Sequence, residues 1–138
     1  MKPGLLLILL CLSTAAMAED LPQDASPDRC LTGASTTLAM NQCYAAAIKA
    51  WDQDMNEQYN KLMKTLSGEP KNKLRVAQRA WLSYRDSWLE ASRSQLSSKG
   101  TLGSVALNAQ SLSLSLVRNQ ALMLQSLGKG RCANPEGC

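Results

Sequence analysis

The side chains best suited to chemistry fall in two groups, at residues 52–59 and at residues 78–86. Each group mixes charged, amide and aromatic residues at spacings that a helix would bring toward one side. Guanidinium groups and aromatic rings make strong fixed contacts, which suits them to binding more than to making bonds. The pattern therefore indicates a binding site, and the candidate residues are Asp52, Asn56, Tyr59, Gln78, Arg79, Trp81, Arg85 and Asp86.

A purely structural role competes with this interpretation and is the one that the residues alone favour. Trp81 and Trp88 would then lie in the core, and Arg85 would form an ion pair with Asp52 or a hydrogen bond with Asn56. Arginine suits such half-buried pairing between helices because its planar fork engages a carboxylate through two bonds.

Composition argues against catalysis. The 138 residues include no histidine, so the usual general base, the Ser-His and Cys-His pairs and the commonest metal ligand are missing. The sequence also has no glycine-rich phosphate loop and no cluster of metal ligands. We therefore expect no enzymatic activity, no metal and no cofactor. A net charge of +4 is too small to predict nucleic-acid binding.

The first 18 residues have the three parts of a secretory signal peptide. Lys2 gives a positive start, Leu5–Leu12 is an apolar run, and Ala16-Met17-Ala18 is a small-residue cleavage site. The apolar run is too short to span a bilayer. We expect residues 1–18 to be removed and the mature protein to be periplasmic or secreted, without a stable membrane anchor.

The rest of the chain reads as an all-α domain. Residues 19–34 are polar and contain Pro22 and Pro27, so we expect an extended leader there. Residues 35–127 predict three long helices, at about 35–66, 70–98 and 104–127, with a cap at Ser35 or Thr36. Because the connections are short, consecutive helices should run antiparallel, as an up-down-up bundle.

Apolar spacing predicts which side of each helix faces inward. The first stripe is Tyr44, Ile48, Trp51, Met55, Tyr59, Leu62 and Leu66, and the second is Leu74, Ala77, Trp81, Tyr84 and Trp88. The third helix is apolar over a wide arc, which favours a central place in the bundle. A contact between copies of the chain, giving a homo-oligomer, is the alternative.

Four cysteines remain after the signal peptide, and an even number in an exported chain indicates two disulfides. We favour pairing between near neighbours, Cys30–Cys43 and Cys132–Cys138, with the latter closing a loop over residues 128–138. A pairing that joins the two ends of the chain is the alternative. It is disfavoured because an odd number of helices places the ends at opposite poles.

Three blocks of sequence carry a further signal: MNQCYA at residues 40–45, WDQDMNEQY at residues 51–59 and AQRAWLSYRD at residues 77–86. Together they resemble the LprI family of lysozyme inhibitors, and the third block is the most specific. The resemblance runs from about Cys30 to Leu127. Members often carry two more cysteines, where this chain has Trp88 and Gln110. Their joint absence is what a mutual disulfide predicts, so the resemblance also implies a Cys30–Cys43 bond.

The resemblance implies an exported helical protein whose partner is lysozyme or another peptidoglycan hydrolase, blocked by occlusion. Two alternatives remain: a structural adaptor of the envelope, and an immunity protein against a secreted toxin. A positively charged chain lacks long-range attraction to a cationic lysozyme, so binding would need a local acidic patch or an inserted loop. The candidates are residues 99–104 and the leader acids Glu19, Asp20, Asp24 and Asp28.

Overall fold

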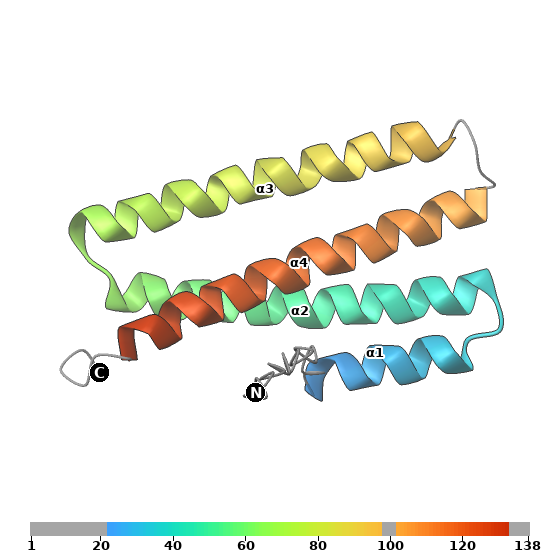
Figure 1. Ribbon diagram of the computed structural model, residues 1–138, viewed down its shortest axis with the longest axis horizontal. Helices are drawn as coiled ribbons and strands as arrows, with labels where there is room; N and C mark the ends of the chain where they lie inside the picture. Colours follow the sequence, from blue (N-terminus) through green and yellow to red (C-terminus); the bar gives the residue numbers. More distant parts are fainter. Residues whose placement is uncertain (1–21, 98–101, 133–138) are drawn as a thin grey trace, which may run out of the picture.

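The computed structural model describes residues 22–97 and 102–132 as four helices, with no strand in these ranges. The helices are α1 (Pro22–Gly33), α2 (Thr37–Thr65), α3 (Gly68–Ser97) and α4 (Leu102–Cys132). The all-α class is confirmed, but the expectation of three helices is wrong. Residues 22–33, expected to be an extended leader, form the short helix α1 (Figure 1).

Two attachments explain why α1 is helical despite its prolines. The disulfide between Cys30 and Cys43 joins α1 to α2 across a Cα–Cα distance of 5.7 Å, which confirms this pairing. Asp24, in the first turn, accepts hydrogen bonds of 2.6–3.0 Å from Arg118 of α4. Tertiary contacts of this kind stabilise a helix too weak to form alone. The Cys30–Cys43 pairing is thus correct. The argument for it from an odd number of helices is wrong, because the described residues form four helices.

Local signals set the ends of α2 largely as expected. The Thr36 hydroxyl accepts a hydrogen bond of 3.1 Å from the backbone N–H of Ala39, so Thr36 is the N-cap. At the other end Leu66 donates its backbone N–H to the carbonyl of Leu62. Gly68 then has a φ of +58°, a conformation that favours glycine, and the chain reverses into α3.

The helix α4 is central, as expected from its wide apolar arc. It packs along α2 and also against α3, while α1 packs against α2 and reaches α4 through the Asp24–Arg118 pair (Figure 1). The core accordingly lies mainly between α2 and α4. Its buried members are Trp51, Met55, Leu62, Val117, Ala121 and Leu124. Of the predicted stripe on α2, every residue is buried or half-buried.

The predicted inward stripe of α3 is partly wrong. Tyr84 and Trp88 are 53% and 50% exposed, and their rings form an edge-to-face pair with centroids 6.2 Å apart. The less exposed positions of α3 instead include buried Gln78, which contacts Gln120 of α4, and half-buried Trp81 and Arg85. The spacing of these three positions is that of one helix face. The buried amide of Gln78 is tolerated there because Gln120 of α4 donates a hydrogen bond to it.

The helix α4 continues to Cys132, beyond the end expected at residue 127. It passes through Gly128 and Gly130, which is compatible with a glycine cost of about 1 kcal/mol in a helix. Cys138 lies outside the described residues, so the Cys132–Cys138 bond stays a prediction, as does the signal peptide at residues 1–18. Among the described helices, none is long and apolar enough to cross a membrane.

Candidate functional site

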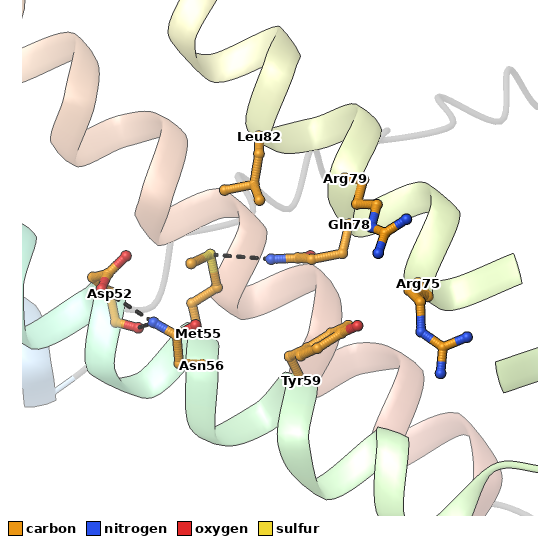
Figure 2. A pocket seen from close by; sticks show the side chains of 8 residues that line it. All are labelled: Asp52, Met55, Asn56, Tyr59, Arg75, Gln78, Arg79 and Leu82. Carbon is orange, nitrogen blue, oxygen red and sulfur yellow. Dashed lines mark hydrogen bonds between the residues drawn. The ribbon is translucent and has the colours of Figure 1, made fainter. Parts of the chain in front are cut away.

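A groove with a volume of about 350 Å³ lies between α2 and α3 (Figure 2). It exists because α2 and α3 pack mainly on α4 and not along each other. Its lining residues are Asp52, Met55, Asn56 and Tyr59 from α2, and Arg75, Gln78, Arg79 and Leu82 from α3. Five of the eight residues predicted from sequence therefore lie together: Asp52, Asn56, Tyr59, Gln78 and Arg79.

A buried chain of polar contacts forms the base of the groove. The side-chain amide of Gln120, on α4, donates to Gln78 Oε1 at 2.8 Å. Gln78 in turn donates to the Met55 sulfur at 3.7 Å, as Figure 2 shows. Gln78 and Gln120 are 7% and 8% exposed. Both polar atoms of the Gln78 side chain are used in these contacts, so this residue fixes α3 against its neighbours and forms the floor of the groove.

Asp52 and Asn56 form the acidic end of the groove. Asn56 Nδ2 donates to the backbone carbonyl of Asp52 at 2.8 Å and to its carboxylate at 3.1 Å (Figure 2). Asp52 is half-buried and Asn56 is exposed. The expected contact of Arg85 with Asp52 or Asn56 is not formed, so this part of the structural interpretation is wrong.

Arg85 instead binds residues of its own helix. Its guanidinium lies 2.8 Å from the carboxylate of Asp86 and 5.4 Å from the ring centroid of Trp81. Arg85 is not among the residues that line the groove, whereas Asp52 is, so the two side chains do not meet. Trp81 packs against the core. These three candidate residues, Trp81, Arg85 and Asp86, therefore lie outside the groove.

The groove has a basic edge formed by Arg75 and Arg79, one turn apart on α3. Arg75 donates a hydrogen bond of 2.8 Å to the side chain of Asn72. Within residues 22–97 and 102–132, neither arginine has a carboxylate partner. Figure 2 places Asp52 at the opposite end of the groove. Two like charges four residues apart destabilise a helix slightly, and no described carboxylate offsets this pair.

Sequence reasoning missed Met55, Arg75 and Leu82 as groove residues. Met55 belongs to the predicted core stripe, and it does reach the core as well as the groove. Arg75, Arg79 and Leu82 are spaced four and three residues apart, which is the spacing of one helix face. That spacing was the available signal for this side of the groove.

Two other hollows are less suited to a partner. One, along α2, contains the exposed Glu57 and Lys61, and the hydrogen bond that Lys61 donates to Glu57 raises the pKa of Lys61. The other has a volume of about 280 Å³ and lies beside the disulfide between α1 and α2. Its lining consists of small residues, three of them alanine, with no charged side chain.

Comparison with known proteins places the fold and the family. The chain is similar to the crystal structure of an uncharacterized protein from Burkholderia thailandensis, with a TM-score of 0.71 and 26% sequence identity. The match covers 84% of this chain but only 57% of the Burkholderia protein. No curated protein matches the sequence. Residues 28–122 match the family described as lysozyme inhibitor LprI. This range includes all the residues of α2 and α3 that line the groove. The chain belongs to the LprI family of lysozyme inhibitors.

Proposed function

We propose that this protein is exported to the periplasm or beyond, binds a lysozyme-type muramidase through the groove between α2 and α3, and inhibits it by occlusion. The observation that carries the proposal is the groove itself, an accessible site with an acidic end, an apolar middle and a basic edge in a chain of the inhibitor family. Such a lining offers directional contacts along with apolar area, which is how protein interfaces gain specificity.

Local contacts must provide the binding free energy. Loss of Lys2 with the signal peptide would lower the net charge from +4 to +3, which gives no long-range attraction to a cationic muramidase. The expected acidic patch is weakened as well, because Asp24 is bound by Arg118. Glu19, Asp20 and residues 99–101 lie outside the described residues. The groove is therefore the better candidate for the contact surface.

The groove residues suit holding a partner and not converting a substrate. Guanidinium and amide groups are hydrogen-bond donors that stay protonated, and a proton-transfer catalyst has to exchange its proton. The one carboxylate of the lining, Asp52, accepts a hydrogen bond from Asn56 and has no second carboxylate beside it in the groove with which to share acid–base work. Inhibition then follows if the bound chain covers the polysaccharide-binding cleft of the muramidase. An immunity protein would use the same occlusion against a toxin, so the two functions differ in the target.

Clearing of a peptidoglycan suspension tests the proposal directly. We expect the purified chain to slow clearing by a c-type lysozyme, with the apparent KM rising and kcat unchanged because substrate and inhibitor compete for one cleft. Unchanged clearing at micromolar excess over several lysozyme types would contradict the proposed function. A catalytically unrelated hydrolase, assayed on its own substrate in the same buffer, controls for nonspecific effects.

A further inference from the structure

The basic residues of α3 divide into two groups according to their partners. Away from the groove, three of the four have an acidic neighbour on the same helix: Lys73–Glu69, Arg85–Asp86 and Arg93–Glu90, at 2.8–3.7 Å. The fourth, Lys71, has no carboxylate partner among the described residues. At the groove, Arg75 and Arg79 have no carboxylate in the described residues and share the site with Tyr59 and Leu82. Two of the three uncompensated cations of this helix, counted in the described residues, therefore lie at the groove and one turn apart.

The spacing of these two arginines suits a pair of carboxylates. Residues four apart on a helix have Cβ atoms about 5–6 Å apart. Glycosidases use two carboxyl groups, about 5 Å apart in retaining enzymes and about 6.5–9.5 Å apart in inverting ones. Each guanidinium can bind one carboxylate through two hydrogen bonds. Two arginines one turn apart on a helix can therefore bind both carboxylates of such a pair at the same time.

We propose that Arg75 and Arg79 bind the two catalytic carboxylates of a muramidase, so that α3 enters the cleft at the point of bond cleavage. This inference rests on the proposed function and adds the chemical group that the site recognises. Tyr59 and Leu82 supply the apolar contacts beside the two cations. Binding by Arg75 and Arg79 accounts for how a basic inhibitor holds a cationic enzyme, because the catalytic pair is an acidic feature that hydrolysis itself requires.

The same contact would also disable the enzyme chemically. The catalytic acid of a glycosidase must carry a proton in order to give it to the leaving oxygen. A guanidinium within hydrogen-bond distance favours the ionised carboxylate over the protonated form. The bound arginines would thus hold the acid in its ionised form, and occlusion and loss of the proton would act together.

The test measures the Kd for a c-type lysozyme with the variants Arg75→Gln, Arg79→Gln and the double variant. Each single change should weaken binding at least about tenfold, because a hydrogen-bonded charge pair is lost. Lys73→Gln and Arg93→Gln are the matched controls: they remove the same charge from the same helix, away from the groove. Circular dichroism confirms that each variant remains helical.

The decisive measurement uses a lysozyme in which the catalytic acid Glu is replaced by Gln. If the arginines bind the catalytic pair, the wild-type chain should bind this lysozyme about tenfold more weakly, and Arg79→Gln should then cost much less than it does against the active enzyme. If the wild-type chain inhibits but the arginine variants inhibit equally well, the inference is wrong and the proposed function stands. If the wild-type chain neither binds nor inhibits any lysozyme, the proposed function fails first.

Discussion

At the residue scale, the side chain of Arg118 contacts two helices besides its own. It binds Asp24 of α1 through both oxygens, and its guanidinium lies 5.4 Å from the ring centroid of Trp51 on α2. Arg118 belongs to α4, so one side chain links three helices. Its side chain is 30% exposed and that of Asp24 is 19% exposed, so solvent screens the pair only in part.

Replacement of Arg118 by methionine should lower the free energy of unfolding by about 1–2 kcal/mol, because the half-buried Asp24 loses its charged hydrogen-bond partner. Urea unfolding followed by circular dichroism measures this. The control is Arg93→Met, since the Arg93–Glu90 pair is exposed and its atoms are 3.7 Å apart. Equal effects for the two substitutions would show that the link between α1 and α4 adds no stability.

At the element scale, the pair Gln78–Gln120 determines how α3 sits on α4. Gln120→Leu alone should destabilise the protein by about 1–3 kcal/mol, because Gln78 Oε1 loses its donor while buried. The double variant Gln78→Leu/Gln120→Leu removes both polar groups and should recover most of that loss. Thermal unfolding of the single and double variants distinguishes the two outcomes, and additive losses would contradict this role for the pair.

The helix α1 depends on its disulfide in the same way. The variant Cys30→Ser/Cys43→Ser should lose about 3 kcal/mol of unfolding free energy, the amount expected for a loop of this size. Urea unfolding measures the loss, and limited proteolysis should cut α1 first. Serine replacement is preferable to a reductant, because a reductant would also reduce the predicted Cys132–Cys138 bond. Proteolysis that begins in α4 would contradict this order.

At the scale of the whole molecule, one side of the wide apolar arc of α4 is buried within the chain, while Met123 and Leu127 on the other side are 60% and 52% exposed. Val117, Ala121 and Leu124 are at most 2% exposed. We therefore expect a monomer at micromolar concentration, and sedimentation velocity measures this. A dimer would favour the alternative of an envelope adaptor. In that case Met123→Ser, which changes an exposed residue of α4, should weaken the association.

Periodicity was a good guide where a helix has a broad apolar neighbour. The stripe from Tyr44 to Leu66 on α2 was correct, and from Trp51 onward it packs with Val117, Ala121 and Leu124 of α4. It failed on α3, where the narrow contact with α4 accepts Gln78 and leaves Tyr84 and Trp88 half-exposed. Pattern alone could not show that Gln120 would supply the partner for that amide.

The helix α1 could not be predicted because its helicity depends on distant residues. Asp24 and Arg118 are 94 positions apart, and no local signal joins them. The groove was predictable in part for a related reason. Asp52, Asn56 and Tyr59 share one face of α2, whereas the place of Arg75 beside them depends on how α3 turns at Gly68. The sequence indicated which residues have suitable side chains, but it did not indicate how α3 is placed relative to α2.

The composition of the groove lining has a consequence for how binding depends on pH. It holds carboxylate, guanidinium, amide, phenol, thioether and aliphatic groups, with no imidazole. Imidazole is the only side chain whose ordinary pKa makes it change charge between pH 5 and pH 8. The groove therefore contributes no histidine titration to the binding of a muramidase between pH 5 and pH 8. A change in the Kd of the complex across that range would be assigned to ionisable groups of the enzyme.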